Sequence, residues 1–268
     1  MATQRIALGL EYDGAQFHGW QTQVQDRNVQ DVLQQALARV ANHPVEVVAA
    51  GRTDTGVHAS GQVVHFDTDA PRPAHAWLLG SNSYLPADAA VQWVAFVADD
   101  FHARYRATAR SYRYTILRRP ARPALLRQRC WWLHRDLDIT AMSAAATALL
   151  GEHDFSAFRA AACQAKRPWR HLRRIALIED GEFVHLEFTA NAFLHHMVRN
   201  LVGVLARVGT GDAPVEWAAE VLAGRDRRHG GITAPPQGLC LTRVDYPEHF
   251  GLHSAATRLY HGPLPRPR

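Results

Sequence analysis

The sequence predicts an α+β fold of two similar strand–helix–strand halves, with a mixed or antiparallel sheet at the core and helices on the outside. Three observations predict it. Some segments alternate apolar and polar residues as half-buried strands do, others carry apolar residues at helical spacing, and both follow the same order twice along 268 residues. We therefore divide the chain into residues 1–106 and 107–268, although no Gly/Ser-rich linker marks the boundary.

The first half opens with an alternating strand at residues 5–12. Residues 28–42 carry one apolar stripe and predict a helix, for which Asn28 is a suitable N-cap. A short strand at 45–49 then leads into the glycine-bounded loop GRTDTG. The remaining elements expected in this half are strands at 61–66 and 91–97 and a helix at 73–80.

The second half repeats this order. Its clearest element is a helix at 193–208, which has a continuous apolar face and is ended by Gly209. The tail that carries Pro263, Pro265 and Pro267 is expected to be loose. The other expected elements are strands at 111–117, 171–179, 182–189 and 239–246, and helices at 140–150 and 215–223.

Basic residues suggest a polyanionic partner. The formal net charge is +5, and Lys166 is the only lysine. Arginine grips phosphate with two parallel hydrogen bonds and stacks on bases, but a GC-rich genome produces the same bias, and each cluster alone can be a solvated face. Trp169 lies within the third of four basic clusters. They are Arg104, Arg106, Arg110 and Arg113; Arg118, Arg119, Arg122, Arg127 and Arg129; Lys166, Arg167, Arg170, Arg173 and Arg174; and Arg225, Arg227 and Arg228.

Several functional classes find no support in the sequence. Cys130, Cys163 and Cys240 are far apart, which argues against a disulfide framework or a cysteine-built zinc site. The histidines form no HExxH motif, so we expect no metal. The N-terminus has no apolar signal-peptide core, and no stretch is apolar enough to span a membrane. We expect a cytoplasmic protein.

The segment from Ala49 to Phe66, AAGRTDTGVHASGQVVHF, carries the most chemical information. Its loop lies between two expected strands, which can hold a carboxylate in a defined position. Asp54 could then act as a nucleophile or base, and Arg52 could bind an anion such as phosphate. Asp and Thr between glycines are also common turn formers, so a purely structural turn is the simpler interpretation of the local pattern alone.

This segment resembles the signature, usually GRTDAGVHA, of the pseudouridine synthases that modify the tRNA anticodon arm. Thr55 stands where the family usually has alanine, and Ser81 where leucine is more usual. The similarity covers residues 5–246, and six further motifs follow in the family's order. They are YDGAQFHGWQTQ (12–23), VQDVLQQAL (29–37), FHARYRATARSYRY (101–114), GEHDFSAF (151–158), NAFLHHMVRNLVG (191–203) and APPQGLCLTRVDY (234–246).

The resemblance implies isomerisation of uridine to pseudouridine at positions 38, 39 and 40 of tRNA, without a cofactor. It also implies a homodimer, a cleft between the two halves, and Asp54 as the catalytic carboxylate. Asp54 would either attack C1′ of the ribose or deprotonate C2′, and the sequence does not choose between them. In either case a sheltered Asp54 needs a cationic partner to stay ionised.

The family's motifs assign that partner and the platform for the base. Arg199 matches the arginine that pairs with the aspartate, and it shares a face with His195 of the expected 193–208 helix. Without the resemblance, a solvent-facing Arg199 would be the simpler interpretation. Tyr112 matches the tyrosine that stacks on the target base, whereas we expect Tyr114 to pack in the core.

Three further assignments remain less specific. Arg52 resembles the arginine that helps to extrude the nucleotide. Leu241, with Leu239, forms either an apolar wall of the pocket or part of the core. We expect His58 to be structural.

Two other functional classes remain as alternatives. One is an RNA-binding module without catalysis, against which the combination of Asp54, Tyr112 and Arg199 argues. The other is a carboxylate glycosidase, which would commonly need a second catalytic acid. The nearest candidates, Asp13 and Asp154, both look structural.

Overall fold

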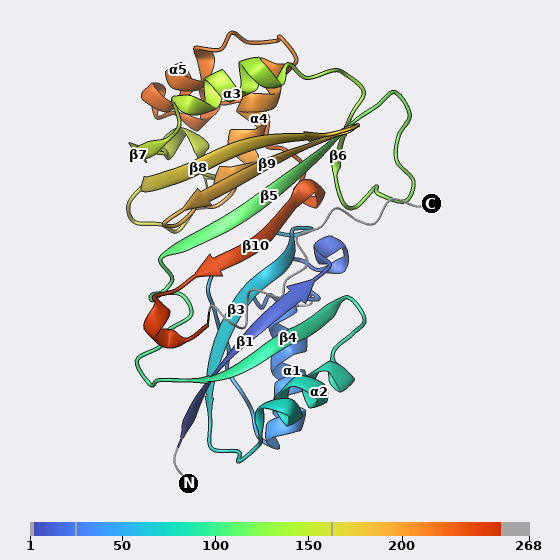
Figure 1. Ribbon diagram of the computed structural model, residues 1–268, viewed down its shortest axis with the longest axis vertical. Helices are drawn as coiled ribbons and strands as arrows, with labels where there is room; N and C mark the ends of the chain where they lie inside the picture. The colour runs from blue at the N-terminus through green and yellow to red at the C-terminus, as the bar shows by residue number, and fades with distance from the viewer. Residues whose placement is uncertain (1–2, 25, 162, 253–268) are drawn as a thin grey trace.

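The computed structural model describes residues 3–24, 26–161 and 163–252; the proline-rich tail expected to be loose therefore lies outside the described residues. Figure 1 shows one long, twisted sheet that runs through the molecule, with a group of helices towards each end. Eight strands follow the order β4-β1-β3-β10-β5-β9-β8-β7, and two short strands, β2 and β6, pair with β3 and β5. The predicted α+β class with a mixed sheet is confirmed.

The first half supplies three antiparallel strands, β1 (Gln4–Tyr12), β3 (His58–Thr68) and β4 (Ala89–Val97). Two helices, α1 (Val29–Ala41) and α2 (Ala74–Tyr84), lie together at this end of the molecule (Figure 1). The strand expected at 45–49 is reduced to β2 (Val48–Ala49). Asn28 is the N-cap residue of α1, as expected, but its side chain makes no capping hydrogen bond, and its amide donates to the carbonyl of Asp26 instead.

The second half supplies the antiparallel strands β5 (Ala109–Arg118), β9 (Phe183–Ala190), β8 (Trp169–Asp180) and β7 (Gly151–Asp154). The sequence did not predict β7 or β6 (Trp131–Leu133), which are short and have no alternating pattern. The helices are α3 (Ile139–Thr147), α4 (Met197–Gly209) and α5 (Trp217–Gly224). The 3₁₀ turns are Gly14–Gln16, Ser156–Phe158, Arg227–His229, Pro236–Gly238 and Glu248–Phe250.

Helix α4 begins at Met197, so the start expected at residue 193 was wrong. His196, the residue before the helix, has a φ of 62°, in the left-handed region that ends a regular helical path. The helix is buried on nearly all sides, as expected for an apolar helix inside a protein. No helix within the described ranges combines the length and apolarity required to cross a bilayer.

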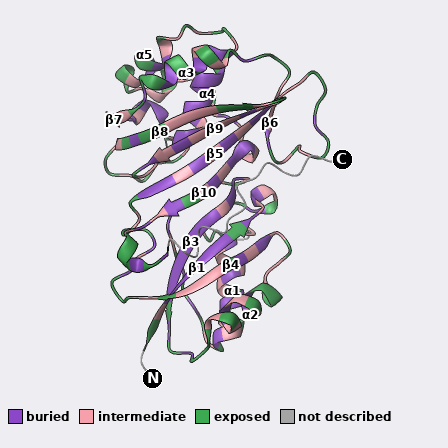
Figure 2. Cartoon of the chain, in the orientation of Figure 1, coloured by how far each residue is buried: buried purple, intermediate pink, exposed green. Residues whose placement is uncertain are grey.

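Strand β10 (Leu239–Asp245) comes last in the chain but lies in the middle of the sheet. It runs parallel to β3 and antiparallel to β5, and so joins the strands of the two halves edge to edge. Leu241 lies opposite Ala59 on one side and Tyr112 on the other. Figure 2 shows that burial continues along β3, β10 and β5, so one core spans both halves.

A close contact between α4 and the chain before β10 gives a stability prediction. A Cβ on Gly203 would lie 1.8 Å from the carbonyl oxygen of Ile232, so Gly203→Ala must push this backbone away. We expect a loss of about 2 kcal/mol or more in the free energy of unfolding, measured by urea denaturation. Gly224→Ala, where a Cβ meets nothing within 4 Å, is the matched control. Equal effects of the two substitutions would contradict the prediction.

Candidate active site

The loop at residues 50–57 connects β2 to β3 and is fixed by hydrogen bonds on both sides of Asp54, with the N–H of Gly56 donating to the carbonyl of Phe17 at 3.2 Å on the C-terminal side. Thr53 is buried; its carbonyl accepts from the N–H of Trp20 at 3.0 Å, and its hydroxyl lies 2.8 Å from that of Tyr12. The guanidinium of Arg110 donates to the carbonyl of Ala50 at 3.0 Å. The loop is therefore a rigid support for its carboxylate.

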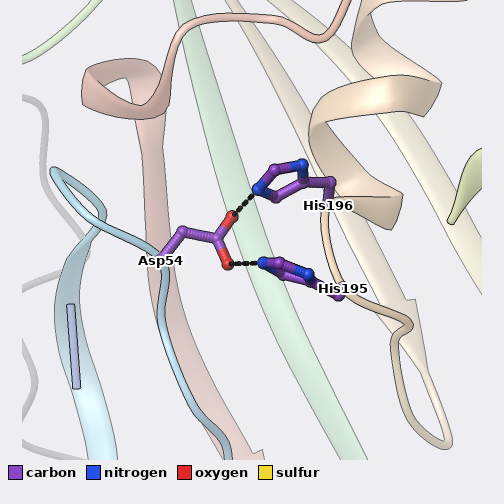
Figure 3. Close-up of side chains that lie close together, drawn as sticks. All are labelled: Asp54, His195 and His196. Carbon is purple, nitrogen blue, oxygen red and sulfur yellow. Dashed lines mark ion pairs between the residues drawn. The ribbon is translucent and has the colours of Figure 1, made fainter. Parts of the chain in front are cut away.

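Three side chains of one segment meet the carboxylate of Asp54 from the opposite side. Nη1 of Arg199 lies 3.1 Å from Oδ2, and Nε2 of His196 lies 3.5 Å from the same oxygen. Nε2 of His195 lies 3.3 Å from Oδ1. Figure 3 shows the two imidazoles directed at the two oxygens from the segment immediately before α4. The Asp54 side chain is only 19% exposed, so these contacts are shielded from bulk water.

The charge of Asp54 results from two opposing effects. Burial alone would raise the pKa of the carboxyl, but His195, His196 and Arg199 together outweigh burial and hold the pKa below its ordinary value. Asp54 is therefore ionised at neutral pH. In return, Asp54 raises the pKa of His195, whereas burial lowers the pKa of His196.

Arg199 is held by the backbone as well as by Asp54. Its Nε donates to the carbonyl of Ala234 at 2.8 Å, and the N–H of Ala234 donates back to the carbonyl of Arg199 at 3.1 Å. The argument that His195 and Arg199 share a helix face was wrong, because His195 precedes α4. Both side chains nevertheless contact Asp54, since the turn before the helix brings His195 back to the carboxylate.

Tyr112 lies on β5 beneath the loop. Its ring packs edge-on against Phe193, with centroids 5.1 Å apart and an interplanar angle of 85°. Burial, and then the nearby charge of Asp54, raise its pKa, so the phenol stays protonated at neutral pH. Tyr114 is fully buried in the core, and its hydroxyl donates to the carbonyl of Pro235.

The two remaining predicted site residues, Arg52 and Leu241, are not among the described residues that contact the Asp54 carboxylate. Arg52 is exposed, and its guanidinium contacts the side chain of Gln164 at 3.4 Å rather than Asp54. Leu241 is completely buried, with Tyr112 as its neighbour across the β10–β5 pair. Leu239 is also buried, opposite Tyr114.

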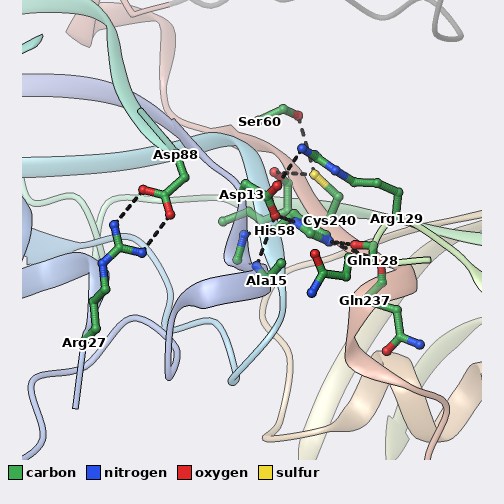
Figure 4. Close-up of polar contacts among 12 residues, drawn as sticks. Asp13, Ala15, Arg27, His58, Ser60, Asp88, Gln128, Arg129, Gln237 and Cys240 are labelled. Atoms are coloured by element: carbon green, nitrogen blue, oxygen red, sulfur yellow. Dashed lines mark hydrogen bonds and ion pairs between the residues drawn. The ribbon is translucent and has the colours of Figure 1, made fainter. Parts of the chain in front are cut away.

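His58 forms a buried network beside the loop, shown in Figure 4. Its Nδ1 accepts from the N–H of Gly14 at 3.0 Å, and its Nε2 lies 2.8 Å from the carbonyl of Gln128, to which it donates. Burial lowers the pKa of His58, which favours this neutral form. Asp13 lies 3.0 Å from Nδ1 and 2.7 Å from Arg129. These contacts join three segments of the chain, which is a structural role.

The two nearest candidates for a second catalytic acid, which were expected to be structural, are engaged elsewhere. Asp13 belongs to the His58 network and also accepts from the N–H of Ala15. Asp154 accepts from the N–H of Ser156 at 2.9 Å, after β7. The contacts of the described residues therefore place neither carboxylate beside Asp54.

The basic clusters are not uniformly available to a ligand. Arg110 is buried and bonds to backbone carbonyls, so its assignment to a binding surface was wrong. Arg113 is paired with Glu187 at 2.7 Å, and Arg118 with Glu179 at 2.9 Å. Other members of the clusters are exposed, and some of these also contact carboxylates. The exposed members without an ion pair to a described carboxylate are Arg104, Arg122, Arg127, Lys166, Arg167 and Arg173; those with one are Arg106, Arg129, Arg174, Arg225 and Arg228.

The donor atoms of Asp54, His195 and His196 lie within 4.8 Å of one another, a spacing at which they could hold a metal ion. Imidazole and carboxylate are ordinary zinc ligands. The guanidinium of Arg199 already places a positive charge against the same carboxylate, which opposes a cation there. The expectation of a metal-free site remains a prediction.

Neither histidine was predicted from the sequence to contact Asp54. The available signal was their position in HHMVRN, immediately before Arg199. Thr55 and Ser81, where the sequence departs from the family's usual residues, are exposed on the loop and buried in α2 respectively. The three contacts of Asp54 involve neither of them.

Comparison with known proteins identifies the relatives of this chain. The family model described as tRNA pseudouridine synthase matches residues 10–106 and 145–247. A protein named tRNA pseudouridine synthase A from Alcanivorax borkumensis is 54% identical over 92% of this chain and 93% of its own length. Proteins of the same name from Aeromonas hydrophila and Shewanella amazonensis are 55% and 51% identical, over 92% and 97% of this chain and 92% and 98% of their own lengths.

Proposed function

Because the chain belongs to the tRNA pseudouridine synthase A family, we propose that it converts uridine to pseudouridine at positions 38, 39 and 40 of the tRNA anticodon stem-loop. The observation that best supports this is the ionised Asp54, held 3.1 Å from Arg199 in a largely buried site. An isomerisation of this kind needs a charged carboxylate that is sheltered from water, and this pair supplies one.

The proposed reaction rearranges one nucleotide without any other reactant. The bond between N1 of uracil and C1′ of the ribose breaks, the base turns, and C5 bonds to C1′ instead. The proton on C5 is lost and N1 gains one, so substrate and product are isomers and no cofactor is required. A carboxylate oxygen of Asp54 would act on the ribose, by attack at C1′ or by removal of the C2′ proton.

The surrounding residues have proposed roles around this step. A uridine must leave its stack before an enzyme can reach C1′, at a cost of about a few kcal/mol. The exposed Arg52 would offset part of this cost by binding the displaced backbone. Tyr112 would support the base, with Phe193 moving aside, and Leu241 would back this wall from the neighbouring strand.

We also propose the cleft between residues 1–106 and 107–268 as the place where tRNA binds, and a homodimer as the assembly. Asp54 comes from the first half, and its three partners come from the second. The net charge of +5 and the exposed arginines suit a phosphate backbone.

Mapping of pseudouridine in unmodified tRNA incubated with the purified protein tests the proposal. We expect conversion at positions 38–40 and release of no free uracil. Tight tRNA binding without any pseudouridine would instead indicate an RNA-binding module. Release of uracil would indicate a glycosidase.

A further inference from the structure

The two oxygens of Asp54 have unequal surroundings. Oδ2 contacts Arg199 and His196, whose side chains are 12% and 29% exposed. Oδ1 contacts His195, whose side chain is 40% exposed. The carboxylate therefore has one oxygen held by two partners and one held by a single, more accessible partner.

The partners also differ in how firmly they are held. Arg199 is tied to Ala234 in both directions through its side chain and its backbone. The backbone of His196 caps α4, with its carbonyl accepting from the N–H of Asn200 at 2.9 Å. His195 precedes the helix, and its carbonyl accepts a hydrogen bond from the N–H of Ala160 at 2.9 Å. Its ring can rotate away from Asp54 without disturbing α4.

A ribose that approaches Asp54 needs an oxygen with a free lone pair directed towards it. Exposing Oδ2 would require loss of the contacts with both Arg199 and His196, the two less exposed partners. Exposing Oδ1 requires only that His195 turn into solvent. The second path disturbs the site less, because an exposed imidazole is readily rehydrated.

We propose that Oδ1 is the oxygen of Asp54 that meets the ribose, and that His195 is a positioning residue that occupies Oδ1 until RNA displaces it. This inference rests on the proposed function for its kinetic consequence. His195 is thus a competitor of the substrate in the free protein, whereas Arg199 and His196 keep Oδ2 in place throughout.

The charge of His195 determines how strongly it competes. The groups that act on it are Asp54 from the loop, which raises its pKa, and Arg199 from α4, which lowers it; the ring of His196 lies 4.1 Å from its own, centroid to centroid. As pH falls and His195 gains its proton, an imidazolium binds Oδ1 more strongly than the neutral ring does. Capture of tRNA should then weaken while the rate of the bound complex is preserved.

The kinetic test compares His195→Gln with His196→Gln as the matched control. Glutamine is neutral at every pH, so His195→Gln should lose the fall of kcat/KM that the wild type shows through the imidazole range. The kcat of this variant at saturating tRNA is measured alongside, so that a change in the chemical step is separated from a change in the capture of tRNA. The control should keep the fall of kcat/KM. The proposal would be overturned if His195→Gln kept the fall of kcat/KM or if the wild type did not show it. A loss of kcat in His195→Gln of about 100-fold or more at all pH values would overturn it as well.

An NMR titration of the histidine rings in the free protein supplies a readout that does not require activity. The pKa of His195 should fall in Asp54→Asn, because its charged neighbour is gone. An unchanged titration of His195 would show that it does not hold Oδ1 and would overturn the inference. A wild type that shows this coupling yet makes no pseudouridine would refute the proposed function instead, which separates the two failures.

Discussion

Replacement of Asp54 by asparagine is expected to reduce pseudouridine formation by at least about 10⁴-fold, the scale of loss when a nucleophile is removed. Asparagine keeps the shape of the side chain but has neither the charge nor the basic oxygen that both chemical routes require. The affinity for tRNA should stay within about threefold, because one buried group contributes little to a large phosphate interface. Loss of tritium from C5 of labelled uridine measures turnover, and filter binding measures affinity.

A suitable control for this substitution is Asp212→Asn. Asp212 is an exposed carboxylate paired with Arg135 at 2.8 Å, and its loss should leave turnover unchanged. Substantial activity in a folded Asp54→Asn protein would remove Asp54 from the mechanism. A parallel collapse of tRNA binding would mean that the substitution had damaged the fold or the RNA surface rather than the chemistry.

The second large effect is expected from Arg199→Ala. Without the guanidinium, the burial that raises the pKa of Asp54 is less strongly opposed, so the pKa rises and less of the carboxylate is ionised at a given pH. The acid limb of the kcat profile should therefore move to higher pH. At neutral pH we expect a loss on the order of 10²-fold or more, the scale observed when a preorganised electrostatic partner is removed.

Arg207→Ala is the matched control on the same helix. Arg207 is exposed and lies over the ring of Trp217, so its removal should leave the pH profile in place. A pH profile that is unchanged in Arg199→Ala would show that the two histidines alone keep Asp54 charged. Arg199→Lys should restore part of the activity, because it returns the charge without the bond from Nε to Ala234.

The sequence predicted those elements whose periodicity reflects burial. The alternating segment at 182–189 is β9, and the apolar stripe at 28–42 is α1. The short strands β6 and β7 were missed because three or four residues carry no period. The start of α4 was misplaced because Leu194 continues the apolar pattern, while the positive φ of His196 leaves no mark in composition.

The sequence motifs identified individual residues of the site, but, apart from the pair of Asp54 and Arg199 that the resemblance implies, they did not show which of these residues contact one another. Asp54 and Arg199 were each assigned within their own segments, and the structure places them together although they are 145 residues apart. His195 and Arg199 were grouped because both were expected on one helix, but α4 begins only at Met197. The direction of His196 towards Asp54 depends on how the turn before α4 meets the loop, which no local pattern specifies.

The position of β10 has a consequence for biosynthesis. The strand that joins β3 to β5 follows both α1 and α4 in the chain, and it pairs with β3 through Cys240 and Leu241. A nascent chain that ends before β10 contains the Asp54 loop and the helix of Arg199, but it lacks the strand that joins β3 to β5. The charged centre is therefore aligned only after β10 has been synthesised, when both halves that it joins already exist.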